Sequence, residues 1–190
     1  MRVIAGTQRG RRLSGPQGTT LRPTSDKVRE ALFSILGSRV FGSRFLDLYA
    51  GTGAVGIEAL SRGARVVTFV ESDPKAVQVL RKNLTVCGLL DQAEVRVGLA
   101  QTFFKRPQWS NGPYDIVFAD PPYAATEAVD LVLERWGTGL LSKDAVMVIE
   151  QDVRATLPTA TDRANLIRRY DYGDSALFLY GPATQDRAAS

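Results

Sequence analysis

The chain has 190 residues, of which 44% are hydrophobic and 23% charged, and this composition fits one globular domain with a proper core. Its net charge of +4 comes with no histidine and a single cysteine, Cys87, which excludes an internal disulfide, the usual zinc ligand sets and histidine-based catalysis. We therefore expect no metal, and any chemistry must come from carboxylates, backbone groups and a cofactor. Because no apolar run could span a bilayer and no signal-peptide pattern begins the chain, we expect a cytoplasmic protein without a membrane partner.

The positive charge is concentrated at the start of the chain. Against Asp26 and Glu30, the first 39 residues contain eight basic residues, which are Arg2, Arg9, Arg11, Arg12, Arg22, Lys27, Arg29 and Arg39. This excess indicates contact with a phosphate backbone, although a solvated, flexible arm would show the same pattern. We expect residues 1–24 to form a basic arm or small hairpin, and the arm to be disordered until RNA binds.

A helix is expected next, because Thr24 or Ser25 can cap it and apolar residues recur at helical spacing up to Gly37. Strands and helices then alternate. Strands are predicted over residues 45–49, 66–70, 93–98, 114–120 and 145–150, and helices over 72–88 and 126–136, with a short helix or loop over 99–109. Two final strands, 165–173 and 175–181, flank a tight turn. The alternation predicts a doubly wound, mostly parallel α/β sheet with a C-terminal antiparallel hairpin over residues 25–181, followed by a flexible tail over 182–190.

The stretch RFLDLYAGTGAVG, residues 44–56, predicts a buried strand, a glycine turn and a helix. Glycines in such a turn allow a close ligand approach that a Cβ would block, and the helix N-terminus offers unpaired N–H groups. We expect a ligand site at the carboxyl end of this strand. The G-x-G-x-x-G spacing alone also fits a dinucleotide site or a tight turn without a ligand.

Two carboxylates narrow the choice of ligand. Asp47 lies inside the apolar strand, where an ionisable group needs a partner such as a ligand ammonium or loop N–H groups. Glu71 ends the next apolar run, where an acid can accept both hydroxyls of a ribose. This arrangement resembles the S-adenosylmethionine site of the Rossmann-like class I methyltransferases, whereas a nicotinamide site would leave Asp47 unexplained.

The fourth predicted strand ends in Asp120, Pro121, Pro122 and Tyr123. Because ligands collect at the carboxyl ends of parallel strands, this tetrapeptide should face the glycine turn. The Asp120 carboxylate and the Pro121 carbonyl can accept both hydrogens of an aromatic amine, so that its lone pair points at a methyl sulfonium. The prolines stiffen the loop, and Tyr123 offers a ring on which a base can stack. The motif predicts methyl transfer to an exocyclic amine, although a Pro-Pro turn whose Asp only caps a helix is the plain alternative.

Asp-Pro-Pro-Tyr is typical of methyltransferases that act on adenine N6, guanine N2 or a glutamine side chain. The stretches RVIAGTQRGRRL, LRPTSDKVREALFSIL and YDYGDSALFLY resemble the bacterial ribosomal small subunit methyltransferase D family, the 16S rRNA (guanine-N2)-methyltransferases, and the similarity spans residues 2–180. The resemblance implies S-adenosyl-L-methionine as cofactor and one loop guanine of small-subunit rRNA as target. It also implies that the enzyme acts on the assembled or nearly assembled small ribosomal subunit. Separately, we expect the protein to be a monomer.

The resemblance assigns roles by position. Cofactor contacts are expected at Arg22, Thr24, Asp47, Tyr49, Gly51, Gly53, Glu71, Ser72, Ala100 and Gln101. The expected catalytic residues are Asp120, Pro121 and Tyr123, and the expected RNA contacts are Arg2, Arg9, Arg11 and Arg12. Many methyltransferases place an acid just after the third strand, but here Gly98, Leu99, Ala100 and Gln101 follow it, so adenine would depend on Gln101, backbone or apolar contact.

Two other functions stay open. A DNA adenine-N6 methyltransferase would use the same tetrapeptide, but the chain has no sizeable extra segment with which to read a duplex. A non-catalytic RNA-binding protein could keep the fold without the activity, although Asp120 and Glu71 are both present.

Overall fold

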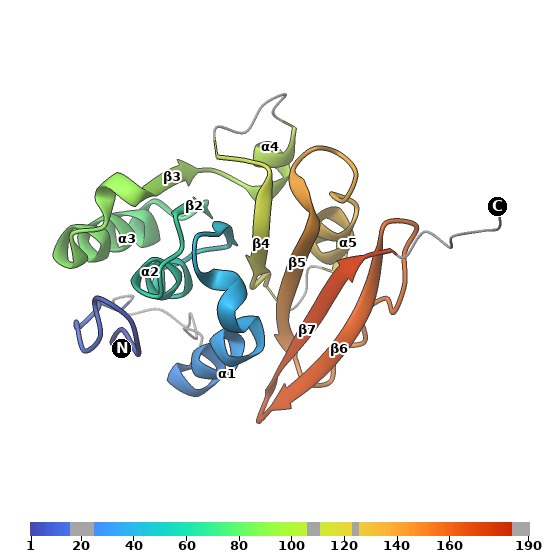
Figure 1. Cartoon of the computed structure of the whole chain (residues 1–190), viewed down its shortest axis with the longest axis horizontal. Helices are drawn as coiled ribbons and strands as arrows, with labels where there is room; N and C mark the ends of the chain where they lie inside the picture. Colours follow the sequence, from blue (N-terminus) through green and yellow to red (C-terminus); the bar gives the residue numbers. More distant parts are fainter. Residues whose placement is uncertain (16–24, 106–110, 123–125, 184–190) are drawn as a thin grey trace.

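Seven strands form a single sheet that runs through the molecule (Figure 1). They are β1 (Arg44–Leu48), β2 (Val66–Glu71), β3 (Ala93–Val97), β4 (Tyr114–Ala119), β5 (Leu141–Asp152), β6 (Ala164–Tyr172) and β7 (Ser175–Pro182). Their order is β3-β2-β1-β4-β5-β7-β6, with parallel pairs from β3 to β5 and with β7 antiparallel to β5 and β6. The structure, a computed structural model, describes residues 1–15, 25–105, 111–122 and 126–183. The predicted fold class is confirmed.

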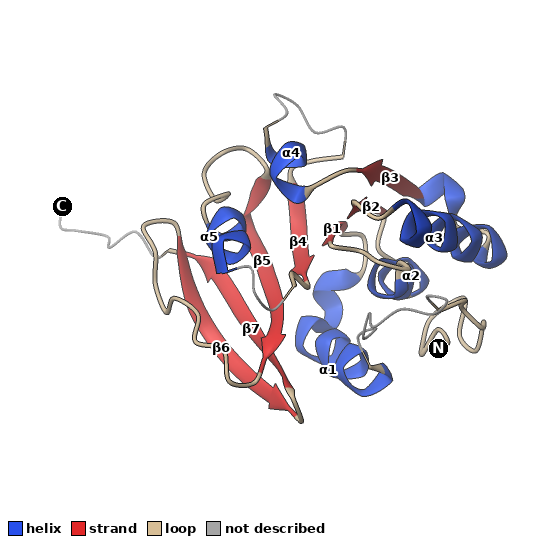
Figure 2. Cartoon of the chain, turned by 180° about the vertical axis from the view of Figure 1, so that it is seen from behind, coloured by secondary structure: helices blue, strands red, loops and turns tan. Residues whose placement is uncertain are grey.

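Helices cover both faces of the sheet (Figure 2). They are α1 (Asp26–Leu36), η1 (Gly37–Val40), α2 (Ala54–Ser61), α3 (Pro74–Cys87), η2 (Leu90–Gln92), α4 (Ala100–Phe104) and α5 (Thr126–Leu133). The first three α-helices pack on one face around Phe45 and Phe118, and α4 and α5 pack on the other around Val117 and Met147. Because the central strands are buried on both faces, they are mostly apolar, as parallel strands are, and the buried Asp47 of β1 is an exception.

Local signals in the sequence set the helix ends. The Ser25 hydroxyl accepts a hydrogen bond from Val28 N at 3.2 Å at the start of α1, and the Asp73 carboxylate accepts one from Lys75 N at 2.9 Å at the start of α3. Gly88 ends α3 with a φ of 65°, a conformation that glycine adopts without strain. These helix boundaries agree with the predicted ones.

Two elements differ from the predicted bounds. Strand β5 begins at Leu141, earlier than expected, because Leu141 pairs with Tyr114 across a register shift before regular pairing resumes at Val146. Helix α5 ends at Leu133, since the chain turns toward Gly137, whose φ is 75°. Neither irregularity leaves a signal that hydrophobic periodicity can detect.

The carboxyl ends of the parallel strands lie at one edge of the sheet, which we call the carboxyl edge. Leu48 at the end of β1 pairs with Val70 of β2 and with Ala119 at the end of β4. Ala119 pairs in turn with Ile149, near the end of β5. The loops that follow β1 and β4 are therefore neighbours, as the predicted site requires.

Residues 1–15 form a small hairpin that is bound to the body of the protein. Val3 N donates to the Arg11 carbonyl at 3.0 Å, and the Val3 side chain is buried. The fully buried Glu58 of α2 accepts hydrogen bonds from Ile4 N at 2.7 Å and from Ala5 N at 2.9 Å. For residues 1–15, these contacts contradict the expectation that the arm is disordered until RNA binds.

The division into an arm (1–24), a methyltransferase domain (25–181) and a tail (182–190) stays a prediction. Strand β7 extends to Pro182, one residue into the predicted tail.

Arg29, which was counted above with the basic residues at the start of the chain, is fully buried and pairs with Asp26 at 3.1 Å. It also faces the buried Glu58 of α2 at 3.9 Å, and it is not accessible to RNA. Among the described residues, no helix combines the length and the apolar character needed to cross a membrane.

Candidate active site

The turn after β1 has a backbone that few side chains tolerate. The φ angles of Tyr49, Gly51 and Gly53 are 59°, 55° and 80°, all in the left-handed region. A Cβ added at Gly53 would lie 2.0 Å from Leu80 Cδ1, whereas one added at Gly51 would meet no heavy atom within 4 Å. Gly53 is thus required for packing, and Gly51 leaves open space next to the backbone for a ligand.

Gly56, the last glycine of the motif, lets α2 approach the sheet. A Cβ there would lie 2.2 Å from the ring of Phe69 on β2. Its backbone N–H donates to Asp47 Oδ2 at 2.9 Å. The glycine motif therefore brings the first turn of α2 onto the buried carboxyl group of β1.

Asp47 is only 1% exposed. Burial, and to a lesser extent the negative charge of Glu71, raises the pKa of Asp47 to about 8, against the smaller opposite effect of the Gly56 hydrogen bond. Asp47 thus has a backbone N–H partner, which comes from the first turn of α2 and not, as expected, from the loop. A buried carboxyl with a raised pKa and one hydrogen-bond donor can gain a further interaction from a ligand cation.

The raised pKa makes stability depend on pH. A carboxyl with a pKa of about 8 in the folded state and about 3.9 in the unfolded chain binds more protons when folded, so stability falls as pH rises between these values. For the wild type, this carboxyl lowers the free energy of unfolding by up to about 1.4 kcal/mol for each pH unit, and we expect Asp47→Asn to lack this contribution. Urea unfolding of the unliganded proteins from about pH 6 to about pH 9 measures it, and parallel curves for the two proteins would contradict it.

Glu71 at the end of β2 joins two loops. Its Oε2 accepts from Gly51 N at 2.7 Å, and its Oε1 accepts from Ser72 N and Asp73 N, each at 2.7 Å. The sequence predicts ribose hydroxyls as partners, which stays a prediction, and in the structure three backbone N–H groups already donate to this carboxylate. A carboxylate can accept about four hydrogen bonds, so one acceptor position is left for a ligand hydroxyl.

Asp120 and Pro121 follow β4 at the carboxyl edge. Burial raises the pKa of Asp120 well above its usual value, and the negative charges of Glu150 and Asp47 raise it further. Asp120 follows directly after Ala119, which pairs with Leu48 at the end of β1, so it lies beside the start of the β1 loop. The Pro121 carbonyl accepts a hydrogen bond from Gln151 Nε2 at 3.1 Å.

The remaining predicted site residues are placed as follows. Ala100 is buried at the start of α4, whereas Gln101 and Ser72 are exposed. Leu99, just after β3, is 56% exposed and offers an apolar surface where an acid is missing. Arg22, Thr24 and Tyr123 lie outside the described residues. The assigned roles of all these residues stay predictions.

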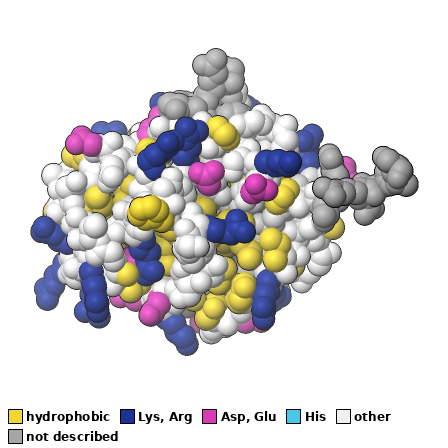
Figure 3. Space-filling view, in the orientation of Figure 1, with side chains coloured by type: hydrophobic (Ala, Val, Ile, Leu, Met, Phe, Trp, Pro, Cys, Tyr) yellow, Lys and Arg dark blue, Asp and Glu magenta, His cyan; other side chains and the backbone are white. Residues whose placement is uncertain are grey.

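The four arginines predicted to contact RNA are all exposed on the N-terminal hairpin, and no ion pair joins them to another described residue. They are Arg2, Arg9, Arg11 and Arg12. Figure 3 shows basic side chains gathered on the side of the molecule where this hairpin lies. They are therefore available to an anionic partner.

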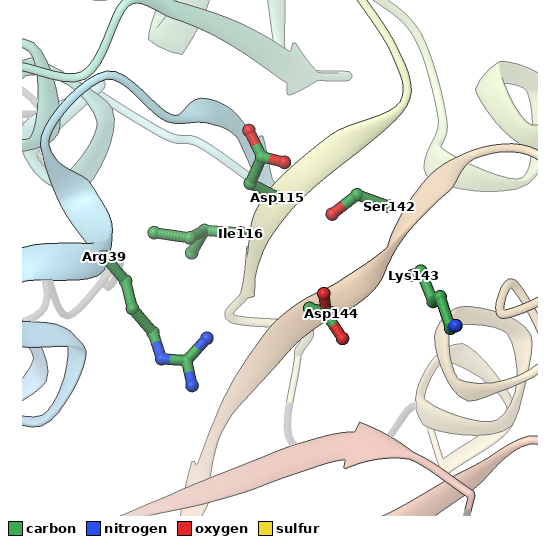
Figure 4. Close-up of a pocket in the computed structure, with 6 residues that line it drawn as sticks. All are labelled: Arg39, Asp115, Ile116, Ser142, Lys143 and Asp144. Atoms are coloured by element: carbon green, nitrogen blue, oxygen red, sulfur yellow. The ribbon is translucent and has the colours of Figure 1, made fainter.

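A hollow of about 340 Å³ lies at the opposite edge of the sheet (Figure 4). Its lining residues come from η1 and from the starts of β4 and β5, and they are Arg39, Asp115, Ile116, Ser142, Lys143 and Asp144. Because it lies at the amino ends of the strands, it is separate from the carboxyl edge.

Three contacts of the site were missed by the reasoning from sequence. They are the Gly56 N–H on Asp47, the charge of Glu150 near Asp120, and the Gln151 bond to Pro121. The polar pair Glu150–Gln151 at the end of an apolar strand is a signal that could have pointed to the last two.

Comparison with known proteins identifies relatives over nearly the whole chain. A family model described as conserved hypothetical protein 95 matches residues 1–181. The ribosomal RNA small subunit methyltransferase D of Escherichia coli K12 is 37% identical over 183 residues, covering 95% of this chain and 89% of that protein. The protein of the same name from Haemophilus influenzae is 41% identical over 158 residues, covering 80% and 79%.

Solved structures agree with this relationship. The yhhF protein of Escherichia coli superposes with a TM-score of 0.79 at 36% identity, covering 96% of this chain and 97% of that one. An RNA methyltransferase from Salinibacter ruber in complex with S-adenosyl-L-homocysteine gives a TM-score of 0.63 at 20% identity, covering 84% and 93%. The second likeness shows the fold alone, which is that of a methyltransferase.

Proposed function

The chain belongs to the family described as conserved hypothetical protein 95. From the arrangement of its site and the names of its relatives, we propose that it transfers a methyl group from S-adenosyl-L-methionine to the exocyclic N2 amine of one guanine in small-subunit (16S) rRNA. The observation that carries the proposal is the neighbourhood of β1 and β4 at the carboxyl edge, with Asp47 near the end of β1 and Asp120 just after β4. The names of relatives at 37% and 41% identity support rRNA of the small subunit as the substrate.

The residues of the β1 and β2 loops fit the cofactor. Open space next to Gly51 leaves room for it, and the remaining acceptor position of Glu71 suits a ribose hydroxyl. Asp47 suits the ammonium group at the amino-acid end of the cofactor, because a nearby cation stabilises the ionised form of a buried carboxyl. When bound, the cofactor supplies an electrophilic methyl group.

The β4 loop supplies the groups for the substrate. A base amine is a poor nucleophile while its lone pair is delocalised into the ring. The Asp120 carboxylate and the Pro121 carbonyl each accept a hydrogen bond from the amine. These bonds hold the nitrogen pyramidal and direct its lone pair toward the methyl group. The methyl carbon would part from the donor sulfur, which leaves as a neutral thioether, and the nitrogen would gain the positive charge. The Asp120 carboxylate stabilises this charge and removes it by accepting one proton from the nitrogen.

The target must be accessible to this loop. An amine stacked inside a helix cannot reach the carboxyl edge, so we propose a loop guanine or one that leaves its stack at modest cost. The assembled or nearly assembled small subunit is the proposed substrate, with the enzyme acting as a monomer and the N-terminal hairpin bound to phosphates.

Incubation of the protein with methyl-labelled donor tests the proposal. Small subunits, naked 16S rRNA and duplex DNA serve as parallel substrates, and digestion identifies the labelled nucleoside. The proposal expects N2-methylguanosine from small subunits. N6-methyladenine from DNA would establish the DNA methyltransferase alternative instead, and donor binding without any labelled substrate would favour a non-catalytic RNA-binding protein.

The hairpin arginines should determine how RNA binding depends on salt. Changing Arg9, Arg11 and Arg12 to glutamine together should weaken rRNA binding and reduce the log–log salt slope by about 2, since each phosphate contact contributes about 0.7 for single strands. Filter binding at several salt concentrations measures the slope. The matched control neutralises Arg39, Arg65 and Lys143 at the opposite edge, and an equal change in both triple variants would contradict the assignment.

A further inference from the structure

Gln151, near the end of β5, is a buried polar residue without a role in the chemistry described so far. Its side chain is 4% exposed. Its Nε2 donates a buried hydrogen bond of 3.1 Å to the carbonyl of Pro121. Gln151 pairs with Ala176 of β7, one of the last pairs of that ladder, so it lies at the carboxyl edge.

The loop that Gln151 touches is difficult to hold by backbone hydrogen bonds. Strand β4 ends at Ala119, so the sheet does not fix the residues beyond it. Neither Pro121 nor Pro122 has a backbone N–H, so at these two positions the backbone can form hydrogen bonds only through its carbonyl groups. The amide of Gln151 supplies this bond from a strand that pairs with β4 up to Ile149 and with β7 through Gln151 itself.

We propose that Gln151 is a positioning residue for methyl transfer, whose amide holds the Pro121 carbonyl at the angle from which its second lone pair accepts a hydrogen of the substrate amine. This inference rests on the proposed function and adds a residue outside the tetrapeptide to it. A carbonyl oxygen accepts two hydrogen bonds, so the Gln151 bond leaves one position for the substrate.

The chemistry of the neighbourhood favours an amide at this position. Asp47, Asp120 and Glu150 already bring three carboxyl groups to the carboxyl edge. A fourth carboxylate at position 151 would repel the Pro121 carbonyl, and an apolar side chain would leave it free to turn. Only a neutral donor both fixes the carbonyl and adds no charge.

The inference is tested with Gln151→Met, which keeps the length of the side chain and removes the donor. We expect kcat on small subunits to fall about 10-fold or more, because small misplacements of reacting groups have effects of this size. The donor Kd and the KM for small subunits should stay within about twofold of wild type, since Gln151 holds an acceptor used in the transition state.

Gln151→Glu adds a readout that a purely structural role would not produce. Burial at position 151 and the nearby carboxylates should raise the pKa of the introduced glutamate. Only the protonated carboxyl can donate to the Pro121 carbonyl, so the activity of this variant relative to wild type should rise as pH falls from about 8.5 to about 6. Taking the ratio to wild type at each pH removes the titration of Asp47, Asp120 and Glu150. Gln151→Met should show no such trend.

The matched control is Tyr180→Phe. The Tyr180 hydroxyl also donates to a prolyl carbonyl, that of Pro158 at 2.8 Å, but on a loop outside the site. Loss of this hydrogen bond should leave kcat unchanged, while it lowers the melting temperature about as much as Gln151→Met does. Wild-type kcat in Gln151→Met, an equal loss of kcat in the control, or a pH-independent ratio for Gln151→Glu would each overturn the inference. Failure of the proposed function is distinct, because the wild type itself would then methylate no guanine.

Discussion

Asp120→Ala is expected to lower kcat for methyl transfer at least about 100-fold, the effect of removing one stabilising group from a catalytic site. The carboxylate accepts an amine hydrogen and stabilises the charge that develops on the nitrogen, and both interactions become stronger in the transition state. Binding of S-adenosyl-L-methionine should change little, because the cofactor is held by the β1 and β2 loops. Single-turnover rates at saturating donor, with donor Kd from calorimetry, measure the two effects separately.

The pH dependence of the wild type supports the same role. Burial and the charges of Glu150 and Asp47 raise the pKa of Asp120, and only the ionised carboxylate can act as acceptor for the amine. The rate should therefore rise with pH until Asp120 is ionised. Asp115→Ala is the control, because Asp115 lies on the same strand at the opposite edge, where it accepts from Arg44 N at 2.9 Å. Normal methylation of small subunits by Asp120→Ala would show that the role assigned to Asp120 is wrong.

Glu71→Ala is expected to raise the Kd for S-adenosyl-L-methionine at least about 100-fold, since each hydrogen bond to a charged group contributes about 1.5–3 kcal/mol. The variant loses the acceptor for the ribose and also the bonds that hold Gly51 and the start of α3. At saturating donor, kcat should remain near wild type, because Glu71 does not contact the amine. Calorimetry gives the Kd and single-turnover kinetics give the rate.

Two further variants serve as comparisons for Glu71→Ala. Glu71→Gln keeps the size of the side chain and removes its charge, so an intermediate loss of affinity is expected. Glu134→Ala removes a carboxylate from a side chain that is 64% exposed and paired with Arg135, and it should have no effect on either quantity. If Glu71→Ala bound the donor as wild type does, the carboxylate would serve only to join the two loops.

Most of the fold could be predicted because its determinants are local. Ser25 and Asp73 cap their helices with side chains that act within three residues, and Gly88 ends α3 through its own backbone conformation. Asp47 was recognised because a charge inside an apolar strand is costly without a partner. The sequence order of the two loops was enough to predict that they meet, since parallel strands share their carboxyl edge.

What could not be predicted depends on residues far apart in the chain. Glu58 follows the pattern of an ordinary helix residue, yet it is fully buried and accepts two backbone hydrogen bonds from the N-terminal hairpin. The Gln151 bond to Pro121 depends on the register of β5 against its neighbours. The hydrogen bond that Glu71 accepts from Gly51 N likewise could not be predicted, because it depends on the path of the turn after β1.

The crystal structure of the protein with S-adenosyl-L-homocysteine tests most directly whether donor and substrate meet at the carboxyl edge. The account predicts a ribose next to Glu71 and a sulfur that faces Asp120 and the Pro121 carbonyl, with Asp47 near the amino-acid end of the ligand. A ligand bound instead in the hollow lined by Arg39 and Asp144, or with its sulfur directed away from Asp120, would contradict it.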